Sequence, residues 1–185
     1  MLSARGAVLV LVLAIPFTGH AAAGDLSTPI VLATSVWSYT YPQNGQPGRT
    51  ATISDRFTLV EAFGLTYAAT DRLRLSIYFQ FGQALTNPPP TSSFTGFSIG
   101  APSLGYNFWG PLTVSINPNF ILRRNGMNDF AFGVNAQLSA GVPLGAGVAL
   151  LLGVSVQNTL TPVTSTALFP YAGLSFKLGS LAEQD

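Results

Sequence analysis

The chain has 185 residues, of which 8% are charged, and its formal net charge is +1. A soluble domain carries roughly 25% charged residues, so this composition disfavours a soluble protein that coats its surface with charge. The near-neutral balance and the lack of a basic patch argue against nucleic-acid binding.

The first residues have the pattern of a secretory signal peptide. Arg5 supplies a positive charge, residues 7–15 form a short apolar run, and residues 21–23 are all alanine. Such a run is too short to span a membrane as a helix, and small residues after it are typical of a cleavage site. We predict a signal peptide at 1–23, cleaved within 20–24, and one domain at 24–185. A retained amphipathic helix is the alternative.

The rest of the chain alternates between apolar and polar residues. In 130–142, apolar residues hold every even position, while Gly, Asn, Gln and Ser hold the odd positions from 133 onwards. A period of two is the pattern of a strand with one apolar face and one polar face. The pattern predicts eight strands, at 30–41, 57–67, 72–82, 94–108, 112–123, 130–142, 148–157 and 168–178.

Two of these strands carry further detail. In the first, Val31, Trp37 and Tyr39 are expected to share one face. In the fourth, the bulky residues change phase after Pro102, which indicates a bulge that shifts the alternation by one residue.

The connections between the predicted strands alternate in length. Short turns are predicted at 68–71, 109–111 and 143–147, and longer polar loops without a strand pattern at 42–55, 83–93, 123–129 and 157–166. An even number of strands, with short turns at one end and long loops at the other, is typical of bacterial outer-membrane barrels. The sequence therefore predicts an all-β protein, an eight-stranded antiparallel up-and-down transmembrane β-barrel in the cell outer membrane.

On this architecture, over residues 30–178, the chain resembles the small outer-membrane barrels of the OmpA and OmpX type. The resemblance implies outer-membrane lipid and lipopolysaccharide around the barrel. It also implies that the four long loops are available to surface or envelope proteins. Strands of such proteins commonly end the chain with an aromatic residue, whereas here the tail continues for seven residues beyond Leu178. A soluble secreted ligand-binding barrel is the alternative fold assignment.

The residue types needed for common enzyme chemistry are missing after the predicted signal peptide. The chain has no cysteine, and its one histidine is His20. This removes a Ser–His–Asp triad, a Cys–His pair and the usual zinc ligands. The acidic residues are scattered singly, which does not favour a calcium site. We expect no enzyme, no catalytic residue, no cofactor and no metal.

An interior charge cluster is the sharpest feature for function, and it is predicted from Glu61, Arg72, Arg74 and Lys177. Glu61 alternates in phase with Phe63 and Leu65, which would turn its carboxylate toward lipid at a cost of about one to a few kcal/mol. A bulge near Glu61 or a different strand register would turn it inward. We expect it inside, paired with Arg74 or another interior base. The pair would be structural, or alternatively a gate or selectivity charge.

Aromatic residues are expected to form girdles at the two membrane interfaces, where Trp and Tyr are enriched. This girdle is predicted from Trp37, Tyr39, Tyr67, Tyr106 and Trp109. A ligand-binding aromatic box is the alternative.

Eight strands enclose an interior just wide enough for side chains to fill. The leading functional hypothesis is therefore a passive barrel that stabilises the envelope or presents its loops. A narrow channel or transporter for small or hydrophobic molecules is the alternative.

Overall fold

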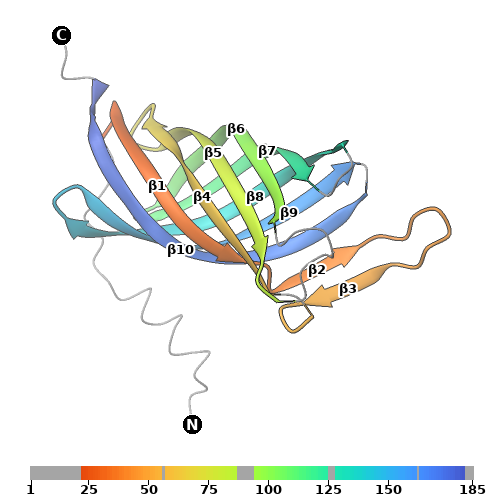
Figure 1. The fold of residues 1–185 in the computed structure, drawn as a ribbon. Helices are drawn as coiled ribbons and strands as arrows, with labels where there is room; N and C mark the ends of the chain where they lie inside the picture. Colours follow the sequence, from red (N-terminus) through yellow and green to blue (C-terminus); the bar gives the residue numbers. More distant parts are fainter. Residues whose placement is uncertain (1–21, 56, 87–93, 125–127, 162, 182–185) are drawn as a thin grey trace.

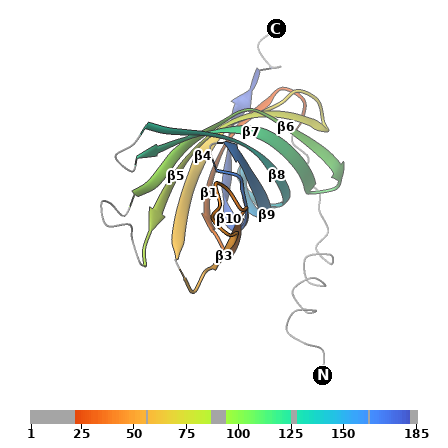
Figure 2. The ribbon, with the colours of Figure 1, turned by 90° about the vertical axis from the view of Figure 1, so that its right-hand side faces the viewer.

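The computed structural model describes residues 22–55, 57–86, 94–124, 128–161 and 163–181. Eight strands of this part form a closed barrel, and two short strands extend from it (Figure 1). Consecutive barrel strands are antiparallel neighbours, and β1 pairs with β10 to close the ring, as the view along the barrel shows (Figure 2). The predicted eight-stranded up-and-down barrel is confirmed. The strands are β1 (Asp25–Thr34), β2 (Trp37–Thr40), β3 (Arg49–Thr52), β4 (Thr58–Ala68), β5 (Leu73–Ala84), β6 (Phe94–Trp109), β7 (Leu112–Arg124), β8 (Asn128–Gly145), β9 (Val148–Thr161) and β10 (Ser165–Ser180).

The outer and inner faces follow the period-two pattern. On β7, Ile116 is 53% exposed, while its neighbour Asn117 is fully buried inside the barrel. Because a closed barrel pairs every strand, its backbone groups are satisfied without water, and the outer face is free to be apolar. The faces predicted for residues 130–142, within β8, are confirmed, since the odd positions 131, 133 and 135 are buried and the even positions 136 and 138 are exposed. No helix in the described part of the chain is long and apolar enough to cross a membrane.

The short turns lie together at one end of the barrel, which we call the turn end. They join β4 to β5, β6 to β7 and β8 to β9. Both ends of the barrel domain lie there as well, since the Leu181 N–H donates to the Gly24 carbonyl at 2.9 Å. The opposite end, which we call the loop end, holds the longer connections. The predicted signal peptide lies outside the described residues except for Ala22 and Ala23.

The last loop is shorter than predicted. β9 continues to Thr161 and β10 begins at Ser165, so the connection expected at 157–166 narrows to three residues. The Thr residues at these positions suit a strand as well as a loop, because β-branched side chains fit a pleated sheet. The strands on either side of the third loop are also longer than predicted, since β7 ends at Arg124 and β8 begins at Asn128. Residues 125–127 of this loop and residues 87–93 of the second loop lie outside the described part.

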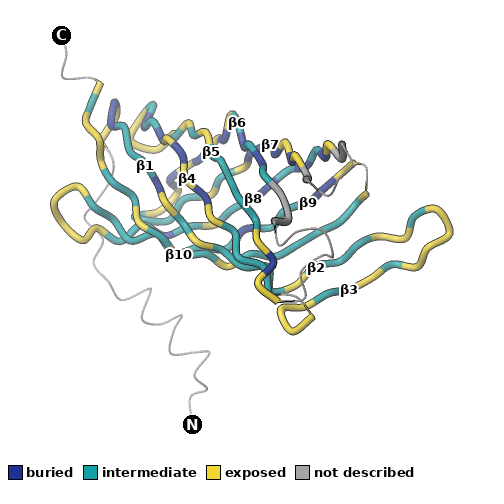
Figure 3. Tube along the Cα trace, viewed as in Figure 1, coloured by how far each residue is buried: buried dark blue, intermediate teal, exposed yellow. Residues whose placement is uncertain are grey.

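The first loop is where the prediction was wrong. Residues 42–55 contain a strand, β3, which pairs with β2 to form a hairpin projecting from the loop end (Figure 1). Much of this hairpin is exposed (Figure 3). The hairpin continues the pairing of the barrel, since β2 also pairs with β10.

The predicted strand 30–41 is also divided in two. Its interruption between β1 and β2 changes the phase, so that Ala33 and then Ser38 face the interior. Val31 therefore lies inside, whereas Trp37 and Tyr39 lie on the opposite face from Ser38. The single shared face expected for these residues is wrong.

The predicted bulge at Pro102 is confirmed. Pairing between β6 and β7 shifts between Gly100 and Leu104. Pro102 has no backbone N–H to contribute to the ladder, and neither has Pro118 on the facing strand. As a consequence the buried inward residues of β6 change from the even position Ser98 to the odd position Ser103.

Two inward tyrosines pack over glycines of neighbouring strands. A Cβ added at Gly64 would collide with the Ile77 carbonyl oxygen and would lie 2.9 Å from the Tyr78 ring. A Cβ at Gly153 would meet the Tyr171 ring at 2.5 Å. These glycines let an aromatic ring lie against the barrel wall, an arrangement that also fixes strand register.

We predict that Gly64→Ala destabilises the folded barrel by about 1–3 kcal/mol, because the new methyl group meets backbone that has no room to move. Urea unfolding of the protein in lipid vesicles measures this loss. Gly141→Ala is the matched control, since the nearest atom to its Cβ is 3.7 Å away. Equal stability of the two variants would contradict the packing argument.

Candidate functional site

The barrel encloses a cavity of about 780 Å³. Its lining includes Asp25 and Gly147 at the turn end and Thr40 and Ser165 at the loop end, so the cavity extends along the barrel. The expectation of an interior filled by side chains is therefore wrong. The physical reason is side-chain size, because most inward positions hold Ser, Thr, Ala or Gly, which do not reach the barrel axis.

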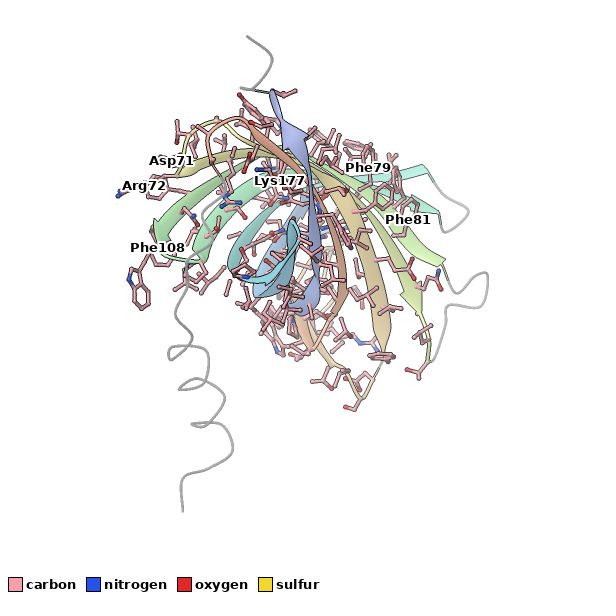
Figure 4. All side chains as sticks on the ribbon, turned by 90° about the vertical axis from the view of Figure 1, so that its left-hand side faces the viewer. Asp71, Arg72, Phe79, Phe81, Phe108 and Lys177 are labelled. Carbon is pink, nitrogen blue, oxygen red and sulfur yellow. The ribbon has the colours of Figure 1, made fainter. Side chains whose placement is uncertain are left out.

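Charged side chains that line the cavity gather at the turn end. Among the described residues they are Asp25, Arg74 and Lys177. The Lys177 Nζ lies 2.8 Å from Asp25 Oδ1, and Asp25 is 7% exposed. The view from the turn end places Lys177 within the ring of strands (Figure 4).

Arg74 carries a second positive charge into the same end of the cavity. Its Nε atom is buried and has no hydrogen-bond partner among the described residues. Arg74 lies within electrostatic range of Tyr78, the next inward residue on β5, and of Asp25. The cavity-lining side chains that the structure describes therefore include two bases and one acid.

The predicted interior cluster is only partly assembled. Arg74 and Lys177 line the cavity, but Arg72 is exposed at the rim, as Figure 4 shows. The Arg72 guanidinium donates to the Tyr106 hydroxyl at 3.4 Å, and this contact raises the pKa of Arg72 above its ordinary value. Asp25 was missed because it precedes the predicted first strand. The alternation of the polar residues Asp25 and Ser27 with the apolar Leu26 could have revealed Asp25, because it extends the predicted strand toward the N-terminus.

The prediction that Glu61 lies inside is wrong. In the ladder Glu61 is opposite Leu32 on β1 and Phe81 on β5, and it points outward with Phe63 and Leu65. Cross-strand partners share a face, so Glu61 faces away from the cavity. β4 pairs with β5 without a bulge that would turn it. Within the described residues Glu61 forms no ion pair with Arg74 or another base.

The middle of the cavity is polar but uncharged. Tyr78 and Tyr171 both line it, and Tyr171 interacts with Ser139 on β8. Nearby, Ser155 donates to the buried side chain of Asn135. These groups make the central cavity wall a mixed surface of hydroxyl, amide and aromatic groups.

A second polar group lies in the wall beside the cavity. Asn117 and Asn119 are 0% and 1% exposed, and their side-chain amide atoms have no hydrogen-bond partner among the described residues. They lie next to the Pro102 bulge, opposite Gly100. They do not line the cavity, so they do not define its chemistry.

The predicted girdle residues lie on the outside. Tyr106 and Trp109 are 48% and 61% exposed near the turn end, and Tyr67 also points outward there. Trp37 lies at the loop end. Tyr39 packs instead on Gly48 within the projecting hairpin. Their role as membrane girdles stays a prediction.

A cluster of phenylalanines covers the outside of β4, β5 and β6. It comprises Phe63, Phe79, Phe81 and Phe97, whose rings lie 4.9–6.3 Å apart between centroids. Phe79 and Phe81 point away from the barrel in Figure 4. Aromatic pairs of this kind add packing energy to an apolar surface. Glu61 is therefore a carboxylate at the edge of a large outward apolar patch.

In the described ranges no three His, Cys, Asp or Glu side chains come together to hold a metal ion. The side chains of Arg123, Arg124 and Asp129, around the third loop, lie outside what the structure describes.

Comparison with known proteins finds likeness at the level of fold. No protein-family model and no curated protein matches the chain. The crystal structure of Neisserial surface protein A (NspA) matches with a TM-score of 0.52 and 15% identity, covering 83% of this chain and 97% of that one. The solid-state NMR structure of the outer membrane protein AlkL in DMPC lipid bilayers also matches with a TM-score of 0.52, at 11% identity over 92% of this chain and 98% of that one. The chain thus has the architecture of small outer-membrane barrels.

We predict that Glu61→Leu stabilises the barrel in lipid vesicles by on the order of 1 kcal/mol, because it removes a charge from the outward apolar face. Glu61→Gln should give a smaller gain. Urea unfolding measures both, and Asp71→Asn in the exposed turn is the control expected to change nothing. A loss of stability on removing the Glu61 charge would mean that this carboxylate has a stabilising partner.

Proposed function

We propose that this protein is an outer-membrane barrel that serves as a narrow channel for small molecules. The observation that carries the proposal is the cavity of about 780 Å³, whose lining residues come from both ends of the barrel. A passive barrel with a filled interior would not have such a cavity. The proposed role is non-enzymatic, in keeping with the lack of histidine and cysteine after His20.

Placement in the outer membrane is supported by three properties of the chain. The outward face is apolar around the barrel, charged residues make up 8% of the sequence, and the N-terminus has the pattern of a signal peptide. The likeness to NspA and AlkL supports the same placement through the fold. In this proposal outer-membrane lipid and lipopolysaccharide surround the barrel.

The size and lining of the cavity suit small solutes. Its volume falls within the roughly 300–1,000 Å³ of small-molecule pockets in proteins. Short Ser, Thr and Ala side chains line much of it, with Tyr78 and Tyr171 near the middle. A molecule that passes would meet hydroxyl groups and apolar surface along most of the path.

A second role, in surface presentation, is favoured by the hairpin of β2 and β3. This hairpin projects from the loop end (Figure 1), and among the described residues β3 pairs only with β2, which leaves its other edge unpaired. Exposed strand edges bind other chains readily. Its proposed partners are surface or envelope proteins. Comparing binding of whole cells by such a partner with and without residues 42–52, which include β3, would test this role, and equal binding would remove it.

For the channel, we predict that reconstituted protein lets liposomes swell in glycerol. Ala33→Phe should abolish most of this swelling, because Ala33 lines the cavity and a phenyl ring would fill it. Leu32→Phe is the matched control, since the adjacent Leu32 is 52% exposed on the outer face and should leave swelling unchanged.

A gel shift on heating confirms that each variant is folded before the swelling is compared. Ala167→Phe provides a second plug from β10, also on the cavity wall. Absence of swelling with folded wild-type protein would overturn the channel and leave surface presentation as the remaining role.

A further inference from the structure

We infer that the turn end of the cavity is a binding site for the carboxylate of a small amphipathic anion, with Arg74 as its principal ligand. The inference rests on the proposed channel and names the class of solute that the channel favours. It starts from an imbalance of charge within the barrel.

The imbalance is one positive charge among the described side chains. Lys177 and Asp25 form an ion pair at 2.8 Å, and Asp25 is nearly fully buried. Arg74 adds a second base to the same cavity, and its buried Nε has no hydrogen-bond partner in the part of the chain that the structure describes. A buried donor without an acceptor is costly, and an anion that supplies the missing acceptor lowers this cost.

Arginine is the residue type best suited to such an anion. Its planar guanidinium offers paired donors in the geometry of a carboxylate, and it stays charged at every physiological pH. Arg74 is placed at the cavity wall by β5, where it pairs with Gly105 of β6. Gly105 carries no side chain, so nothing from this neighbour covers the guanidinium.

Asp25 does not prevent anion binding at Arg74. Its carboxylate is held by Lys177 on β10, which faces β1. Lys177 therefore neutralises the charge of Asp25. The Arg74 Nε remains a donor without an acceptor among the described residues.

The rest of the cavity accommodates an uncharged body. Toward the loop end the described lining includes Val31, Ala33, Val60, Ile121, Ala167 and Phe169. Ser and Thr residues lie between these apolar groups. A short-chain carboxylate fits this arrangement, with its charged end at Arg74 and its alkyl chain pointing to the loop end.

The test measures ion selectivity in planar bilayers with butyrate as the probe. Under a gradient of potassium butyrate, the reversal potential of the wild-type channel should show preference for butyrate over potassium. Arg74→Gln should reduce this preference several-fold, because fixed charges in a narrow path set ion selectivity. Arg74→Lys should keep most of it. Arg72→Gln is the matched control, since Arg72 is exposed at the rim.

Asp25→Asn should act in the opposite direction and increase the preference for butyrate, because it removes the acid of the cluster. This second variant keeps the test decisive if Arg74→Gln fails to fold. A wild-type channel that prefers potassium, or an Asp25→Asn channel that loses butyrate preference, would overturn the inference.

Swelling in glycerol separates the two proposals. If glycerol passes while butyrate has no advantage over potassium, the carboxylate site is wrong and the channel stands. If neither glycerol nor butyrate passes through folded protein, both proposals fail. If wild-type protein passes glycerol, and Arg74→Gln lowers butyrate preference while Arg72→Gln does not, both are supported.

Discussion

The pairing of β1 with β10 is the constraint on which the rest of the structure depends. These strands pair from Asp25 opposite Ser180 to Ala33 opposite Tyr171, and this ladder closes the sheet. In lipid an unpaired backbone group costs several kcal/mol, so an open edge is not tolerated. Closure also divides every strand into an outer and an inner face. The apolar outside, the polar inside and the cavity all follow from that division.

Much of the barrel could be predicted because period-two alternation survives in most strands. On β7 the contrast between Ile116 and Asn117 is readable in the sequence and reproduced in their burial. The phase shift at Pro102 could also be predicted, because a proline breaks a ladder and the bulky positions change parity after it. Where the pattern is interrupted by residues that suit either strand or loop, as in β3 and the start of β10, sequence periodicity alone could not set the boundaries.

Glu61 shows why register was harder to predict than strand position. A slip of one residue would bring Glu61 inside, but it would also turn Phe63 and Leu65 inward and Ala62 and Thr66 outward. The penalty for one outward carboxylate is smaller than the loss of an entire apolar face. The preference of the apolar side chains for the outer face therefore outweighs the preference of the single charge for the interior. The interior ion pair instead forms between Lys177 and Asp25, which barrel closure, and not a hairpin, brings together.

The number of strands sets the radius of a barrel, but the volume of the inward side chains decides whether it is open. Eight strands ordinarily leave a space that side chains fill. Here the large inward rings of Tyr78 and Tyr171 lie over Gly64 and Gly153, close to the wall. Rings held in this way take little space from the axis, while the smaller inward residues do not reach it. The strand count could be predicted from periodicity, whereas the cavity depends on where these two rings lie, and that is a property of cross-strand packing. The same glycines that shape the wall thus determine how much of the interior is left open.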